Sequence, residues 1–419
     1  MKKNNITFIF LLPAIWGIIL TAGAFHSLQS EESLSNEELT KRVEILTEEV
    51  EKNKTGADLY TPVPEKGQKG LGPAASKVYT VDQGLTFGGY GEILYQNFDS
   101  KDESGTASGK ADSIDMLRAV FYVGYRFNDM FALNTEIEIE HGEEIFVEFL
   151  YIDAMFSKYI NLRAGMLLAP LGWINELHEP PVYLGAIRPL TEQYIIPSTW
   201  REIGAGLYGE AFGFSYRFYG MTSLYGGKFD APKGLRSGRQ KGIKAVAENF
   251  SVAGRLDYSG LKGFTIGTSV YYGDQGQDKA YNIPVLIIDG HVDFQWKGLY
   301  LRGLVAWSKI GNADAIFSDT TEEPGSQLLG MYGEAGYDIL HPFSTEQQVI
   351  LFTRYEWIDT QYRTPSAYAA DGANQQQVIT LGASYKPIIN IVLKLDYQWK
   401  FNETGTGVNQ FNVGLGYIF

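Results

Sequence analysis

The chain has 419 residues, a formal net charge of -14 and no cysteine. The lack of cysteine excludes disulfide staples and thiolate metal sites. The 47 glycines, 27 tyrosines and 24 phenylalanines suit a strand-rich barrel with aromatic girdles. No stretch after residue 24 is apolar for long enough to form a transmembrane helix.

Residues 1–24 have the features of a secretory signal peptide. Lys2 and Lys3 give a positive end, residues 6–20 are apolar, and the small residues 22–24 precede Phe25. We therefore expect export and cleavage near Ala24. Without a cysteine after the signal, a lipid-anchored precursor is excluded.

Residues 25–54 predict a short coiled-coil helix in the periplasm. Leu39, Val43, Leu46 and Val50 recur at spacings of four, three and four. The partners would be copies of the same helix, which suggests an oligomer. An amphipathic spacer that frays at its ends remains the alternative.

Residues 55–83 predict a flexible linker. Pro62, Pro64 and Pro73 interrupt this stretch, which also contains four glycines.

Residues 84–419 predict an all-β fold, a transmembrane antiparallel β-barrel. Period-two alternation of apolar and polar residues marks about sixteen strands. The expected strands are 84–98, 112–127, 131–141, 144–157, 161–169, 201–211, 214–224, 250–258, 264–272, 284–296, 299–309, 328–340, 347–358, 375–385, 390–401 and 409–419. The even number and the usual length of about 10 residues fit a bacterial outer-membrane barrel.

The connections between these strands alternate between short and long. Tight turns such as 128–129, 212–213 and 297–298 alternate with longer polar loops such as 170–200 and 225–249. Short turns on one side and long loops on the other are typical of outer-membrane barrels. A soluble sandwich has no reason to keep this parity.

Charged residues alternate with apolar residues within the strands and must face the lumen, since charge is costly against lipid. A barrel of this size encloses an aqueous channel, so we expect a wet interior and a pore. The expected pore-lining wall residues are Arg118, Arg126, Arg163, Arg217, Arg255, Arg302, Arg354, Glu136 and Glu138. These charges either form a field across the constriction or pair with one another.

The segment 170–200 is the longest loop and predicts a constriction. We expect its charged residues to meet those of the wall if the segment folds inward; these are Glu176, His178, Glu179, Arg188 and Glu192. The alternative is a lid over the mouth.

The loop 225–249 is basic and would lie at the mouth. Its cations are Lys228, Lys233, Arg236, Arg239, Lys241 and Lys244. They could attract anionic solutes or contact lipid phosphates, or they could simply be solvated.

We expect no enzyme activity, no metal, no cofactor and no nucleic-acid partner. The run 204–209 fits a dinucleotide-binding glycine motif but lies within a strand. Residues 176–179 resemble a metal-ligand cluster, but no other histidine is near in sequence. No local Ser/His/Asp pattern surrounds the histidines.

The run from residue 161 to 209 resembles a region of a bacterial outer-membrane porin family often grouped with the phosphate-selective porins. The most specific parts are residues 178–181 (HEPP) and 196–202 (IPSTWRE), and the resemblance covers residues 85–419. It implies a sixteen-stranded, trimeric barrel with an inward loop that passes small hydrophilic solutes, with anions such as phosphate among them.

The sequence thus predicts a passive outer-membrane channel in contact with outer-membrane lipid and lipopolysaccharide. A surface-exposed structural or adhesive barrel that binds an external partner is the alternative.

Overall fold

The computed structural model describes residues 35–55 and 61–419, which fall into two separate units. The signal peptide expected at residues 1–24 lies outside the described residues. Helix α1 (Asn36–Thr55) forms the first unit. Its first turn is capped by Ser35, whose Oγ accepts a hydrogen bond from the backbone nitrogen of Glu38 at 3.2 Å. Leu39, Val43 and Leu46 are exposed on this helix, and its association into a coiled coil remains a prediction.

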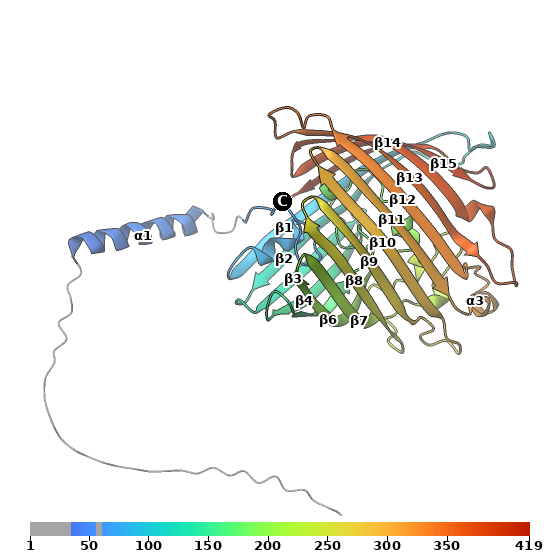
Figure 1. The fold of residues 1–419 in the computed structure, drawn as a ribbon, viewed down its shortest axis with the longest axis horizontal. Helices are drawn as coiled ribbons and strands as arrows, with labels where there is room; N and C mark the ends of the chain where they lie inside the picture. The colour runs from blue at the N-terminus through green and yellow to red at the C-terminus, as the bar shows by residue number, and fades with distance from the viewer. Residues whose placement is uncertain (1–34, 56–60) are drawn as a thin grey trace, which may run out of the picture. The chain divides into compact units, whose positions relative to one another are not determined.

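The second unit is a closed antiparallel barrel (Figure 1). Within residues 61–419 each strand pairs with its sequence neighbours, and the first strand pairs with the last. The sixteen strands are β1 (Gly84–Phe98), β2 (Ser113–Arg126), β3 (Phe131–Glu140), β4 (Glu144–Met155), β5 (Asn161–Leu168), β6 (Arg201–Ala211), β7 (Phe214–Thr222), β8 (Phe250–Leu261), β9 (Phe264–Asp274), β10 (Pro284–Trp296), β11 (Leu299–Ile310), β12 (Gln327–Asp338), β13 (Gln348–Arg363), β14 (Gln375–Ile388), β15 (Ile391–Asn402) and β16 (Gln410–Ile418). The predicted fold class and number of strands are confirmed.

Two of the tight hairpin turns show which backbone conformation allows such short connections. Phe212 and Gly213 have φ of 53° and 84°, and Lys297 and Gly298 have φ of 47° and 80°. Two consecutive residues with positive φ are the mark of the turn whose twist matches that of paired strands. Glycine at the second position lowers the steric cost of that conformation.

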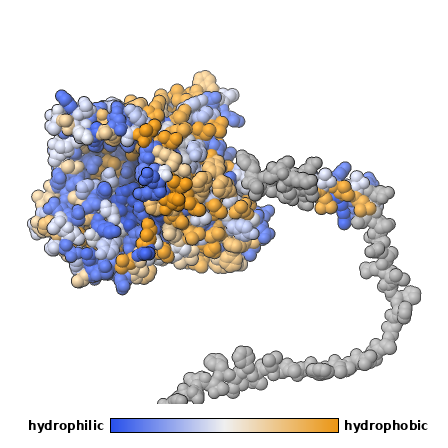
Figure 2. Space-filling view, turned by 180° about the vertical axis from the view of Figure 1, so that it is seen from behind, coloured by the Kyte–Doolittle hydropathy of each residue, from blue (hydrophilic) through white to orange (hydrophobic). Residues whose placement is uncertain are grey.

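The strands alternate between an apolar outer face and an inner face that is covered by other parts of the chain. On β14, Ile379 and Leu381 are exposed while Thr380 is fully buried. On β15, Leu393 and Leu395 are exposed while Lys394 and Asp396 are buried. Figure 2 shows apolar side chains gathered over much of the barrel wall, beside a hydrophilic region.

The outer face gives a direct test of its lipid contact. Leu381 lies midway along β14 and is 57% exposed. Leu381→Arg should lower the free energy of unfolding in a bilayer by about 2–4 kcal/mol, because the charge would face hydrocarbon. The control is Ile389→Arg, which changes an exposed residue in the turn that follows β14 and should cost about 0–1 kcal/mol. Urea titration in lipid vesicles measures both, and equal losses would argue against a lipid-facing Leu381.

The expectation of a flexible linker is wrong for residues 61–83. This stretch contains the short helix η2 (Ala75–Tyr79) and packs inside the barrel, with Leu71, Ala74 and Val78 buried. Asn134 on β3 donates a hydrogen bond from Nδ2 to the carbonyl oxygen of Ala75 at 2.9 Å. The proline- and glycine-rich composition resembles a linker, but the wall supplies partners to the backbone of this lumen segment, as we call residues 61–83.

The remaining helices are short and lie in the connections. They are η3 (Pro180–Val182), α2 (Thr191–Tyr194), η4 (Gly226–Lys228), η5 (Arg236–Gly238), α3 (Ala313–Thr320) and η6 (Gly372–Asn374). None of the helices in the described parts of the chain is long and apolar enough to cross a membrane.

The barrel interior contains an apolar core. Leu171, Ile174, Ile195, Ile196 and Trp200 from the segment between β5 and β6 are buried against inward-facing wall residues. The ring centroid of Trp200 is 4.7 Å from that of Tyr271 on β9. The expectation of a wet interior is therefore wrong for this part of the lumen, because apolar residues of the long loop and the lumen segment pack there against the wall.

Candidate pore constriction

The segment 170–200, which we call the inward loop, lies inside the lumen and not over its mouth. Its backbone and side-chain donors reach carboxylates on strands around the barrel. The contacts are Gly172 N to Asp289 at 3.2 Å, Tyr183 Oη to Glu92 at 2.7 Å, Ala186 N to Asp396 at 2.6 Å and Leu190 N to Glu356 at 2.6 Å. Carboxylates that accept hydrogen bonds from backbone N–H groups hold the loop across the channel.

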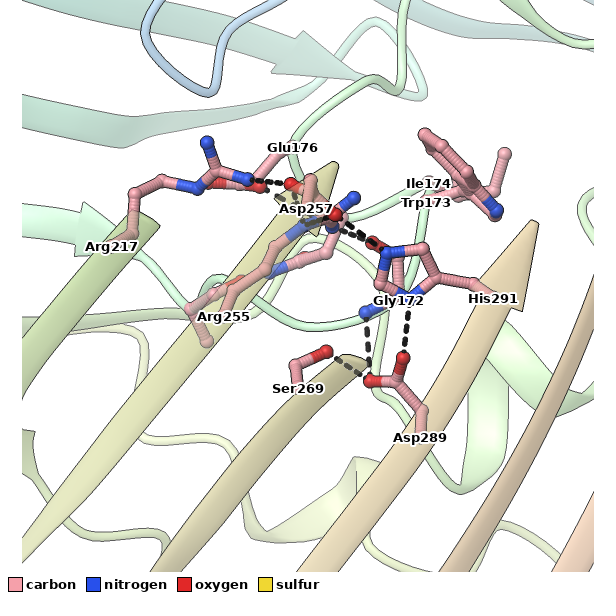
Figure 3. A network of polar contacts seen from close by, with 12 residues as sticks. Gly172, Trp173, Ile174, Glu176, Arg217, Arg255, Asp257, Ser269, Asp289 and His291 are labelled. Atoms are coloured by element: carbon pink, nitrogen blue, oxygen red, sulfur yellow. Dashed lines mark hydrogen bonds and ion pairs between the residues drawn. The ribbon is translucent and has the colours of Figure 1, made fainter. Parts of the chain in front are cut away.

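One anchor of the inward loop is a buried cluster of two arginines and two acids (Figure 3). Arg217 on β7 and Arg255 on β8 are directly opposite each other in the sheet. Like charges in such a cross-strand pair repel. Asp257 offsets this repulsion, because its carboxylate lies 2.7 Å from Arg217 and 2.8 Å from Arg255. Glu176 from the inward loop contacts the same two arginines at 3.0 and 3.4 Å.

The same network continues through His291 on β10. Its Nε2 is 2.8 Å from Asp257 and its Nδ1 is 2.6 Å from Asp289 (Figure 3). Trp173 of the inward loop packs edge-on against this imidazole, with ring centroids 4.9 Å apart. Arg255 donates a hydrogen bond to the carbonyl oxygen of Gly172. Wall charges and loop backbone therefore form one continuous polar network.

Glu192 organises the inward loop from within. Its carboxylate accepts hydrogen bonds from the backbone nitrogens of Trp173 at 2.7 Å and Ile174 at 2.6 Å, and from the Tyr332 hydroxyl at 2.5 Å. Burial raises the pKa of Glu192, and these hydrogen bonds oppose the rise. Burial also raises the pKa of Glu176, against the opposing effect of Arg217 and Arg255.

Four of the other five wall arginines that the sequence placed in the lumen are paired with acids. Arg163 lies 2.8 Å from Asp153, Arg302 lies 2.9 Å from Asp293, and Arg354 lies 2.8 Å from Glu356. Arg118 is 3.5 Å from Glu92 and 3.7 Å from Glu138. Arg126 stands apart, at the short-turn end of β2, where it donates to the carbonyl oxygen of Asp129. Of the two alternatives for the wall charges, mutual pairing describes most of the arginines.

His178 and Glu179 join the inward loop to the wall and to the lumen segment. Nε2 of His178 is 3.3 Å from Glu136 on β3. Burial alone would lower the pKa of His178, but the Glu136 carboxylate outweighs it and raises the pKa to about 9. Glu179 accepts hydrogen bonds from the backbone nitrogens of Ala74 and Ala75, and burial raises its pKa to about 7.

The basic loop 225–249 divides into two groups. Lys228, Lys233 and Lys244 are exposed. Arg236, Arg239 and Lys241 are half-buried. The two half-buried arginines contact the inward loop, since both donate to the carbonyl oxygen of Ser198 and Arg239 also reaches the Thr199 hydroxyl at 2.8 Å. Arg188 precedes these residues in the inward loop and donates a hydrogen bond to the carbonyl oxygen of His178 at 3.5 Å.

Several residues of this polar interior were missing from the predicted set. Asp153 binds Arg163, Asp289 accepts a hydrogen bond from Gly172 of the inward loop, and His291 packs against Trp173 of that loop. Asp289 and His291 are two residues apart on β10, so strand periodicity places both on the same face. That alternation, with charge on the inward face, was a signal that could have found them.

A cavity of about 470 Å³ opens beside the network at the short-turn end of the barrel. Its lining includes Lys66 of the lumen segment, Trp173 of the inward loop, and Arg302, Glu334 and Lys386 of the wall. This vestibule, as we call the cavity, combines cations, acids and an indole ring.

Comparison with known proteins identifies the class of fold. The anion-selective porin of Comamonas acidovorans superposes with a TM-score of 0.55 at 12% identity, over 81% of this chain and all of that one. OmpF of Salmonella typhi, in complex with daunomycin, gives 0.54 at 12% identity, over 81% and 98% of the two chains. The trimer form of OmpT from Vibrio cholerae gives 0.51 at 10% identity, over 81% and 100%. The barrel therefore has the fold of an outer-membrane porin.

At the level of sequence, the chain belongs to the same family as an uncharacterized protein of Aquifex aeolicus. The two are 37% identical over 360 residues, which cover 81% of each chain. No family model matches the chain. The resemblance to porins is thus confirmed for the fold, while membership of the phosphate-selective group remains a prediction.

Proposed function

We propose that this protein is a passive diffusion channel of the bacterial outer membrane for small hydrophilic solutes, with a preference for anions, and that it catalyses no reaction. The porin fold and the inward loop support the channel. The preference for anions rests on one observation, the arrangement of Arg236 and Arg239.

These two arginines lack an acidic partner among the described residues. Their guanidinium groups donate only to backbone carbonyls and to the hydroxyls of Ser198 and Thr199. Burial, together with neighbouring Arg188, lowers the pKa of Arg236, and burial together with Arg236 lowers the pKa of Arg239 to about 9. A small anion between them would relieve this repulsion, as cation clusters in low-dielectric clefts concentrate counter-ions.

Two lysines of the wall extend this pattern along the barrel. Lys394 donates to the carbonyl oxygen of Gly185 at 2.9 Å, and Lys386 donates to that of Pro181 at 2.8 Å. Neither forms an ion pair in the part of the chain that the structure describes. Within the described residues, cationic side chains without an ion-pair partner therefore occur in the basic loop, on β15 and at the vestibule.

The proposed partners follow from the fold. The apolar wall would contact outer-membrane lipid, and lipopolysaccharide would surround the long loops. We further propose a homotrimer, a state named for OmpT of Vibrio cholerae, with the exposed apolar residues of α1 packing against the same helix of other subunits.

The test is the reversal potential of single channels in a planar bilayer under a potassium chloride gradient. The wild-type protein should show open steps with a potential of the sign expected for chloride permeation. Replacing Arg236 and Arg239 together by glutamine should reduce the anion-to-cation permeability ratio, by a factor on the order of 10 if the pair concentrates anions.

The matched control is the double replacement of exposed Lys233 and Lys244 by glutamine, which removes the same charge from the same loop. It should leave the ratio close to the wild-type value. Equal effects of the two pairs would show that only the overall charge of the mouth matters. A silent membrane with folded protein would contradict the channel and favour the adhesive barrel.

A further inference from the structure

Three side chains with metal-ligating atoms converge on one point in the lumen. They are Glu136 on β3, Glu148 on β4 and His178 of the inward loop, and one ligand atom of each lies within 4.8 Å of the others. All three are fully enclosed, with exposed fractions of 0%, 0% and 2%. They come from two wall strands and one loop, so sequence spacing gave no sign of the group.

The carboxylates of this group lack the donors that buried carboxylates require. Both side-chain oxygens of Glu148 and Oε2 of Glu136 are buried without a hydrogen-bond partner. The nearest cation, Arg201, holds its Nη1 3.6 Å from Glu148 Oε1, which is longer than a hydrogen bond. Buried carboxylate oxygens without partners are costly, and they point to a positively charged ligand at this position.

The histidine is oriented as a ligand. Its Nδ1 lies 3.0 Å from the carbonyl oxygen of Asn175, which can only accept a hydrogen bond, so Nδ1 carries a proton. Nε2 then faces Glu136 Oε1 at 3.3 Å. Two ligands bound at roughly 2.0–2.2 Å to a tetrahedral ion are about 3.4 Å apart, which matches this separation.

We propose that Glu136, Glu148 and His178 bind a divalent first-row transition-metal ion, and zinc fits this ligand set best. One imidazole nitrogen with carboxylate oxygens suits zinc, whereas calcium and magnesium prefer oxygen ligands alone. Because His178 belongs to the inward loop and both acids belong to the wall, the ion would fasten the loop to β3 and β4.

A proton on Nε2 is the competing occupant of this site. It would allow His178 to pair with Glu136 alone, and Glu148 would keep only the carboxyl of Glu138 and the more distant Arg201 beside it. A metal ion would satisfy all three side chains together. If the metal ion is the occupant, the protein binds zinc stoichiometrically; if the proton is the occupant, it does not. This difference can be measured directly.

The experiment uses the full mature protein, folded in detergent and stripped with a chelator, in a calorimetric titration with zinc chloride. One zinc ion should bind per chain, and His178→Asn or Glu148→Gln should abolish this binding. The control is His141→Asn, because His141 is a half-exposed histidine 2.6 Å from Asp115 and represents an ordinary surface site. This control should bind zinc as the wild type does.

Cobalt(II) provides a second measurement that does not depend on the variants folding. The wild-type protein should give a visible ligand-field absorption band that zinc removes at one equivalent and that excess calcium or magnesium leaves in place. Folding of each variant is checked by its heat-modifiable migration in gels. The proposal fails if folded wild-type protein binds no zinc, if binding survives in both ligand variants, or if His141→Asn abolishes it. Neither readout requires conduction, so such a failure would leave the proposed channel untouched.

Discussion

Replacing Asp257 by alanine should destabilise the folded barrel by about 3–5 kcal/mol, the usual cost of removing one partner from a buried ion-pair network. Asp257 is 2.7 Å from Arg217, 2.8 Å from Arg255 and 2.8 Å from His291. Without it, two arginines that face each other across the sheet would share only Glu176. The loss can be measured by urea unfolding in lipid vesicles, followed by tryptophan fluorescence.

The same change should alter the channel, because Glu176 and Gly172 of the inward loop are held through this cluster. We expect larger and noisier single-channel currents as the loop loses its anchor. The matched control is Asp293→Ala, since Asp293 forms an ion pair with one arginine, Arg302, accepts a hydrogen bond from Gln295, and has a side chain that is 18% exposed. That replacement should cost less than the loss of Asp257, because Asp293 contacts one arginine whereas Asp257 contacts two arginines and a histidine. Similar losses for both variants would contradict the role of Asp257 as the central anchor.

Removing the lumen segment should enlarge the pore. A variant without residues 36–80 retains the whole barrel but lacks the chain that occupies the short-turn end of the lumen. Since a barrel of sixteen strands leaves an aqueous channel when its interior is free, its single-channel conductance should rise by a factor of about 2 or more.

The control for this variant is removal of residues 36–55 alone, which deletes α1 and keeps the lumen segment. Its conductance should match that of the wild type, even if its oligomers dissociate more readily in detergent. An unchanged conductance in the larger deletion would show that the segment does not obstruct the permeation path.

The strands could be predicted from sequence because a bilayer imposes a regular pattern on them. Leu393, Leu395 and Tyr397 had to alternate with Lys394 and Asp396, whatever the rest of the chain did. The alternation of short turns and long loops then indicated the layout of an outer-membrane barrel. Both signals depend on residues that are close together in the chain, so a single sequence is enough to recognise them.

The contents of the lumen could not be predicted in the same way. Whether Glu176 contacts Arg217 depends on where a loop of some thirty residues turns, and no spacing rule encodes that position. The lumen segment was missed for a related reason. The backbone nitrogens of Ala74 and Ala75 donate hydrogen bonds to Glu179, which is 105 and 104 residues away in the chain. No local sequence pattern indicates a contact over that separation.

The closure of the barrel has a consequence for its biogenesis. Residue 90 on β1 pairs with residue 418 on β16, and Phe419 exchanges backbone hydrogen bonds with Gly89. The seam therefore joins the first and last strands of the barrel, which are far apart in the chain, and closing so long a loop is slow. Until it closes, β1 and β16 present unpaired edges that can add strands from other chains. Transit to the membrane should thus be the stage at which this protein is most prone to aggregation, and the point at which a holding chaperone would matter most.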